Sequence, residues 1–123
     1  LRDEAFRGNK RKTNQLLSDT VIDNDKIMFY LSVINQRLVK LSEVAILNKN
    51  TSLENAINLV KPPIFWKDKP IFIEHMNKWN LEKIKSTLKN NYELEVKIKS
   101  SNFANCNLLI KKLMVDICSI ASS

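Results

Sequence analysis

The sequence predicts an all-α domain, a compact bundle of about six or seven helices. Apolar residues recur at helical spacing along most of the 123 residues. The chain contains a single glycine, Gly8, so hairpins that depend on glycine turns are disfavoured. The alternation typical of strands extends over no comparable length, apart from the short stretch 93–99. A chain of this length is expected to form one domain rather than two.

Gly8 separates the first two predicted helices. Residues 1–7 are typical of a helix end, and glycine is favoured just after a helix C-terminus. Asn9 is placed to cap a second short helix. The polar residues 18–25 predict a loop, and Asp25 is expected to cap the helix that follows.

The clearest element is a helix of about twenty residues, which would be about 30 Å long. Its apolar residues are spaced four, three, four, three and four positions apart, which is a heptad-type seam. These residues are Ile27, Leu31, Ile34, Leu38, Leu41 and Ala45. Residues 48–50 end the helix, and we expect it to form the backbone of the domain.

A short helix and a proline corner follow. Thr51 with Glu54 three residues later matches a capping box, which predicts a helix start at Thr51. Pro62 and Pro63 end this helix, because neither proline can extend it.

Three more helices are predicted after the corner. Asp68 is expected to cap the first, with Pro70 near its first position. Asn80 is expected to cap the second, which extends through Ile98, and the third begins after Phe103. Their expected buried residues are Phe72, His75, Met76 and Trp79, then Leu81, Ile84 and Leu88, and finally Leu109, Leu113, Ile117 and Ile120.

The net charge of +7 invites comparison with nucleic-acid-binding proteins. The cations are 16 lysines and only 4 arginines, beside 15 asparagines and 13 isoleucines. Codons rich in A and T encode lysine, asparagine and isoleucine, and base and phosphate readers favour the arginine fork. The charge therefore favours a solvated lysine-rich surface over a DNA-binding patch. Within the basic run, Lys10, Arg11 and Lys12 are candidate phosphate contacts, although an exposed helix start explains them better.

Catalytic, metal-binding and cofactor-binding patterns do not assemble from these residues. A single glycine excludes Gly-rich phosphate loops and nucleophile elbows. The only histidine, His75, is expected to be packed or half-exposed on a helix rather than to act as a general base. Cys106 and Cys118 are twelve positions apart in one predicted helix, about 18 Å, too far for a disulfide. We therefore expect no enzyme active site, no cofactor and no metal, and no apolar stretch long enough to span a membrane.

The most informative segment is Val60-Lys61-Pro62-Pro63-Ile64-Phe65-Trp66-Lys67. It resembles the Pro-Pro-aromatic-aromatic-Lys segment in the C-terminal domain of the bacterial DNA polymerase III delta subunit. Other segments are similar to that family in the same order: Ala5-Phe6-Arg7-Gly8, the helix 26–48 with Gln36-Arg37-Leu38, Trp79, and the spacing of Glu95 and Lys99. The chain departs from the family at Lys10, Arg11 and Lys12, where an acid and apolar residues are expected, and at Ser101-Asn102, which lacks a glycine.

The resemblance implies a part in the clamp loader, which places the sliding clamp on primed DNA during chromosomal replication. Residues 1–123 would be a single helical oligomerisation domain at the C-terminal end of a longer protein, whose AAA+-like N-terminal domains lie outside this sequence. The delta subunit lacks a working ATPase site. The resemblance therefore implies that the protein is non-catalytic, lies in the bacterial cytoplasm and needs no cofactor. Its partners would be the delta-prime and tau/gamma subunits in a helical collar, with the clamp and DNA contacted by other domains. The alternative is a basic helical domain that binds nucleic acid directly.

A collar domain needs apolar surface for its neighbours. Apolar residues outside the main seams are the candidate interface, although a wider core stripe explains them equally well: Phe29, Val33, Ile46, Ile73 and Val115. For the family-signature residues Pro62, Pro63, Phe65, Trp66 and Trp79, a core role is expected, with the aromatic rings filling the space beneath the corner. On that expectation, Trp66→Ala would cost on the order of 3–5 kcal/mol.

Overall fold

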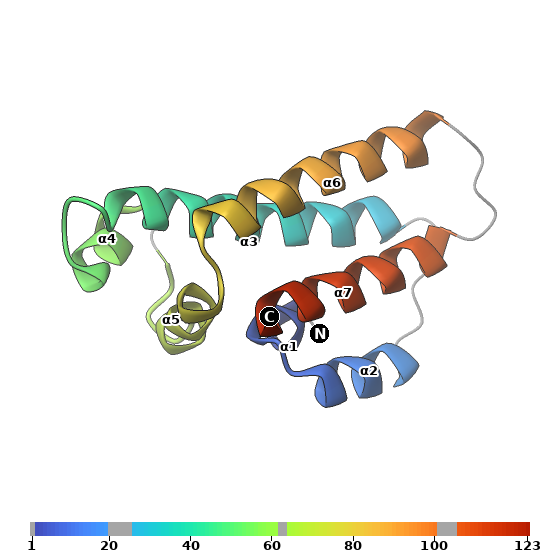
Figure 1. Ribbon diagram of the computed structural model, residues 1–123, viewed down its shortest axis with the longest axis horizontal. Helices are drawn as coiled ribbons and strands as arrows, with labels where there is room; N and C mark the ends of the chain where they lie inside the picture. Colours follow the sequence, from blue (N-terminus) through green and yellow to red (C-terminus); the bar gives the residue numbers. More distant parts are fainter. Residues whose placement is uncertain (1, 20–25, 62–63, 101–105) are drawn as a thin grey trace.

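Two long helices lie side by side and run in opposite directions (Figure 1). They are α3, Ile27–Leu47, and α6, Leu81–Ser100. The computed structural model describes residues 2–19, 26–61, 64–100 and 106–123. Within these residues it has seven helices and no strand, so the predicted all-α bundle is confirmed.

The predicted seam of α3 is its buried face, except at its last position, where Val44 is buried and the predicted Ala45 is only partly buried. Its core residues are Ile27, Leu31, Ile34, Leu38, Leu41 and Val44, each at most 2% exposed. A hydrogen bond between side chains joins α3 to α6. The amide nitrogen of Asn91, a fully buried residue of α6, donates to Oδ1 of Asn35 on α3 at 2.8 Å. An amide pair between two helices disfavours other registers of the same apolar seam.

The last helix, α7 (Cys106–Ser122), packs against the first two. They are α1 (Arg2–Arg7) and α2 (Lys10–Asp19), and Figure 1 shows both beside α7. Gly8 ends α1 with a φ of +81°, the left-handed conformation expected after a helix C-terminus. A Cβ on this glycine would lie 3.1 Å from the backbone nitrogen of Ser122, so the same position also allows α1 to approach α7 closely.

Two short helices, α4 (Leu53–Leu59) and α5 (Lys69–Lys78), lie between the two long helices in sequence. The predicted start at Thr51 is wrong by one residue, because Ser52 is the N-cap and its Oγ accepts a hydrogen bond from the amide of Asn55 at 3.3 Å. Both hydroxyl residues suit a cap, so sequence spacing alone does not separate them.

The other predicted caps are mostly confirmed. The side chains of Asn9 and Asn80 accept from the amides of Lys12 at 3.1 Å and Lys83 at 2.8 Å. Asp68 holds the predicted N-cap position of α5, but it accepts from the amide of Phe72 through its backbone carbonyl rather than its carboxylate. The predicted cap Asp25 lies outside the described residues.

The helix predicted to begin at Asn80 is continuous through the segment 93–99, where strand-like alternation competed. None of the helices described is both long and apolar enough to cross a membrane.

Candidate functional site

The contact between α1 and the end of α5 is built on Trp79. This side chain is 4% exposed, and its indole Nε1 donates to the backbone carbonyl of Phe6 at 2.9 Å. The two rings also pack, with centroids 5.2 Å apart. The predicted core role of Trp79 is therefore confirmed, and the tryptophan fixes the chain just before Gly8 against α5.

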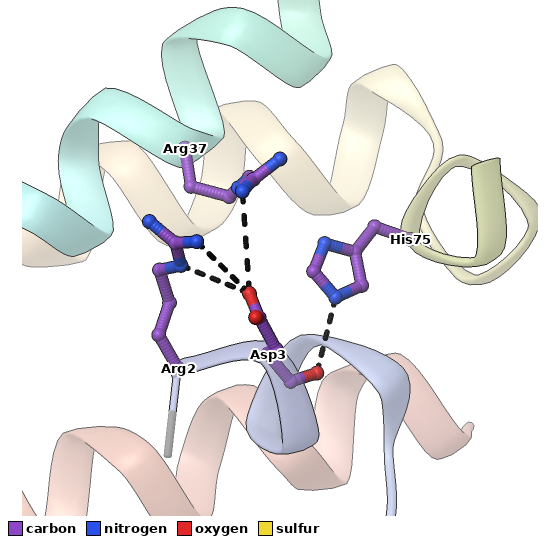
Figure 2. A network of polar contacts seen from close by, with 4 residues as sticks. All are labelled: Arg2, Asp3, Arg37 and His75. Carbon is purple, nitrogen blue, oxygen red and sulfur yellow. Dashed lines mark hydrogen bonds and ion pairs between the residues drawn. The ribbon is translucent and has the colours of Figure 1, made fainter. Parts of the chain in front are cut away.

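A polar network lies next to this contact, where α1 meets α3 and α5 (Figure 2). Oδ1 of Asp3 accepts from Nε and Nη2 of Arg2 at 3.1 and 3.0 Å. The same oxygen lies 4.0 Å from Nη2 of Arg37 on α3. Burial alone would raise the pKa of Asp3, but the charge and hydrogen bonds of Arg2, with the nearby charges of His75 and Arg37, outweigh it and lower that pKa. Asp3 is therefore the charged centre of the network.

His75 joins the network through the backbone of Asp3. Its Nε2 lies 3.0 Å from that carbonyl oxygen, and Figure 2 shows the ring pointing toward it. Since a carbonyl only accepts, Nε2 carries the proton and donates. The side chain is fully buried, and burial above all lowers the pKa of His75 to about 4, with Arg37 and Arg2 acting in the same direction. His75 is thus a neutral core residue, as predicted.

Arg37 is the least compensated charge of this network. Its side chain is only 10% exposed, and its guanidinium carbon lies 5.3 Å above the ring of Phe72. Burial lowers the pKa of Arg37, Arg2 lowers it further, and the carboxylates of Asp3 and Asp68 oppose the shift. In the sequence, Arg37 stands out only as part of the Gln36-Arg37-Leu38 segment of the family resemblance. Its position three residues after Ile34 and four before Leu41 was the available signal, since both are on the buried seam.

The core role predicted for Phe65 and Trp66 is wrong, because both side chains are exposed. They are 57% and 67% exposed, their ring centroids are 5.9 Å apart, and Nζ of Lys67 lies 5.4 Å from the Trp66 ring. A tight turn, closed by the amide of Asp68 donating to the carbonyl of Phe65 at 2.8 Å, precedes α5. The buried aromatic positions near α5 are Phe72 and Trp79, whereas the adjacent rings on the turn remain at the surface. Exposed paired aromatic rings are typical of protein-binding surfaces.

A cavity of about 310 Å³ opens between this turn and α3. Its lining combines cationic, polar and apolar side chains from α1, α3 and the turn: Arg2, Gln36, Arg37, Lys40, Ile64, Phe65 and Asp68. We call this the Arg37 cavity. It is the point where the buried network meets the exposed aromatic pair.

The remaining family-signature residues lie apart from this cavity or outside the described structure. Pro62 and Pro63 are not among the described residues. Glu95 and Lys99 form an ion pair of 3.1 Å on α6, in the helical spacing that the sequence indicated.

The candidate interface residues are mainly at the surface but do not form one patch. Phe29, Ile46, Ile73 and Val115 are 65%, 53%, 38% and 41% exposed, and Val33 is half-buried. Phe29 and Ile46 lie near opposite ends of α3, about 25 Å apart along its axis. A role for each as a contact with a neighbouring subunit stays a prediction.

The candidate phosphate contacts Lys10, Arg11 and Lys12 are exposed in the first turn of α2. The amide of Lys12 already donates to Asn9, so the helix N-terminus has one fewer free donor for an anion. Phosphate binding here also stays a prediction.

The titratable residues form no metal-binding cluster in the part of the chain that the structure describes. Cys118 is buried in α7 with a free thiol. No family model, curated protein or solved structure matches the chain. Its likeness to the delta subunit therefore depends on the order and spacing of the motifs given above.

Proposed function

We propose that this chain is the subunit-association domain of a clamp-loader delta subunit. The observation that carries the proposal is the exposed Phe65–Trp66 pair beside the Arg37 cavity. The pair belongs to the segment 60–67, which carries the strongest resemblance to the family. A segment that is similar to the family and presents two aromatic rings at the surface suits a contact with another protein.

The buried network supports this assignment by giving the surface a rigid base. Trp79, Phe6 and His75 fix α1 against α5. Arg37 joins α3 to α5, because its guanidinium lies over the ring of Phe72. Because the rings of Trp79, Phe6 and His75 pack together, this part of the molecule suits recognition by another protein. Recognition is favoured when the binding surface is already ordered, since less conformational entropy is lost on association.

The partners in this proposal are the delta-prime and tau/gamma subunits, in the bacterial cytoplasm. The sliding clamp and DNA would be contacted by other domains of the longer protein. The domain itself would contribute no catalytic group and no cofactor to the loader.

A deletion experiment tests the proposal. The full-length protein and a version lacking residues 1–123 are each mixed with delta-prime and tau/gamma, and the products are separated by gel filtration. Only the full-length protein should elute with the partner subunits. Equal co-elution of both proteins would show that this chain is not the association domain.

The competing function is direct binding of nucleic acid, which a net charge of +7 permits although the excess of lysine over arginine disfavours it. It predicts that the protein binds DNA with an affinity that falls steeply as salt rises, because bound phosphates release counterions. The association function predicts weak DNA binding by this chain. A fluorescence titration with duplex and primed DNA at several salt concentrations distinguishes the two functions.

A further inference from the structure

The Arg37 cavity combines a buried cation with an open mouth. The Arg37 side chain is nine-tenths buried, yet it lines a space of about 310 Å³ that also contacts the exposed ring of Phe65. A volume of this size accommodates one side chain from another molecule. The cavity therefore offers a partly dehydrated guanidinium to a group entering from outside.

Contacts with the described residues leave part of the hydrogen-bonding capacity of the Arg37 guanidinium unused. Its carboxylate neighbour, Oδ1 of Asp3, is 4.0 Å from Nη2, which is longer than a hydrogen bond of about 3 Å. That oxygen already accepts two hydrogen bonds from Arg2. Below the guanidinium is the Phe72 ring, which offers a cation–π contact but no oxygen acceptor. An arginine has five N–H donors, so within the described residues Arg37 can still accommodate an acceptor.

The charge around the cavity favours an anion. Its lining has three cations, Arg2, Arg37 and Lys40, and one acid, Asp68, while Asp3 adds a second carboxylate behind the lining. A carboxylate matches a guanidinium particularly well, because its two oxygens accept from two N–H groups in parallel.

We propose that the Arg37 cavity binds the carboxylate of an acidic side chain from a partner protein. An apolar side chain next to that acid packs against Phe65 and Trp66 at the mouth. The proposal rests on the proposed association function, since it specifies the chemistry of the neighbouring subunit's surface at this corner.

A protein carboxylate fits the cavity better than a nucleic-acid phosphate. Asp68 lies in the lining and would repel the next phosphate of a backbone. A largely buried arginine beside Ile64 and the exposed ring of Phe65 is typical of a central anchor in a protein interface. Nucleic-acid grooves instead track the backbone with a continuous series of cations.

A titration with blocked tripeptides tests the cavity without any loader subunit. One tripeptide contains leucine, aspartate and phenylalanine, and the control replaces aspartate by asparagine. Binding is followed by NMR at the Arg37 Nε–H and the Trp66 indole, up to about 10 mM peptide because a lone anchor binds weakly. The buried Trp79 indole, bonded to Phe6, is an internal reference that should not move.

We expect the aspartate peptide to shift the Arg37 and Trp66 signals and to bind about tenfold more tightly than the asparagine peptide. Equal affinities, or no shift at Arg37, would overturn the proposal. Displacement of the aspartate peptide by an oligothymidylate of about twelve nucleotides would overturn it in favour of a phosphate site.

Two variants keep the test independent of folding. Arg37→Gln should abolish the difference between the peptides, and circular dichroism checks that it is folded. Phe65→Ser changes a side chain that is 57% exposed, so the fold should persist while peptide affinity falls about fivefold. Tyr92→Ser is the matched control, because Tyr92 is 50% exposed on α6 and does not line the cavity. An equal loss in Phe65→Ser and Tyr92→Ser would contradict the proposal.

The same variants in the full-length protein separate this inference from the proposed function. If the wild-type protein binds the loader subunits and Phe65→Ser and folded Arg37→Gln bind equally well, the inference fails and the function stands. If the wild-type protein binds no loader subunit but takes the aspartate peptide selectively, the function fails and the carboxylate site stands.

Discussion

Trp66 and Trp79 show how two residues of one type acquire different roles. Trp79 is 4% exposed and hydrogen-bonded to Phe6, whereas Trp66 is 67% exposed on the turn before α5. Trp79→Ala should lower the free energy of unfolding by about 3–5 kcal/mol, because it opens a cavity and leaves the Phe6 carbonyl without its donor. Trp66→Ala should change it by less than about 0.5 kcal/mol. Urea unfolding of both variants measures the difference, and a large loss in Trp66→Ala would contradict the structure.

His75 should make the stability of the domain sensitive to pH. Its pKa is about 4 in the folded protein and 6.5 in the unfolded chain, so the unfolded state binds the proton first as pH falls. Stability is therefore highest above pH 6.5 and decreases from there toward pH 4. The expected loss between pH 7.5 and pH 5 is about 2 kcal/mol, measured by urea unfolding at each pH.

His75→Gln is the control for this pH dependence. Glutamine keeps an N–H donor for the Asp3 carbonyl but does not titrate, so the loss between pH 7.5 and pH 5 should be much smaller. Asp3 does not account for this window, because its lowered pKa makes its contribution disappear only below pH 3.8. An unchanged pH dependence in His75→Gln would show that another group is responsible.

At the residue scale, the predicted burial of Trp79 and His75 is confirmed, whereas the core role predicted for Phe65 and Trp66 is wrong. Trp79 and Trp66 are the same residue type, so apolar character could not separate them. The difference arises from the turn between Phe65 and Asp68, whose closure orients the rings, and no helical periodicity applies to a turn of this length.

At the scale of helices, Gly8 controls how α1 meets α7. Its φ of +81° disfavours any side chain, and a Cβ would lie 3.1 Å from the nitrogen of Ser122 and 3.3 Å from the carbonyl carbon of Ala121. Gly8→Ala should therefore destabilise the domain by at least about 1–2 kcal/mol, because the backbone penalty and the crowding add. Thermal unfolding measures the loss, with Ser119→Ala as the control because Ser119 is an exposed residue in α7. A Gly8→Ala variant as stable as the control would contradict the close approach.

The helices themselves were largely predictable because their signals are local. The 4-3-4-3-4 spacing predicted the buried face of α3, and Asn9 and Asn80 were found as caps from their positions before apolar periodic segments. The start of α4 was missed by one residue, since Thr51 and Ser52 have equivalent capping groups and the choice depends on backbone geometry.

At the scale of the whole molecule, contacts between distant segments were not predictable. Asp3, Arg37 and His75 are far apart in sequence and meet only because α5 packs against both α1 and α3 (Figure 2). Periodicity identifies which face of a helix is buried but not which helix covers it. The Arg37 cavity, which combines residues of α1, α3 and the turn before α5, therefore emerged only from the fold.

The proposed association function is tested most directly by the affinity of the full-length protein for the delta-prime and tau/gamma subunits of a clamp loader. Sedimentation velocity of the protein mixed with delta-prime and tau/gamma gives this value. If the chain is an association domain, one complex containing all three proteins should form, with a dissociation constant of about 1 μM or lower, as expected of a stable assembly. Independent sedimentation of the protein at concentrations well above about 10 μM would show that it is not one.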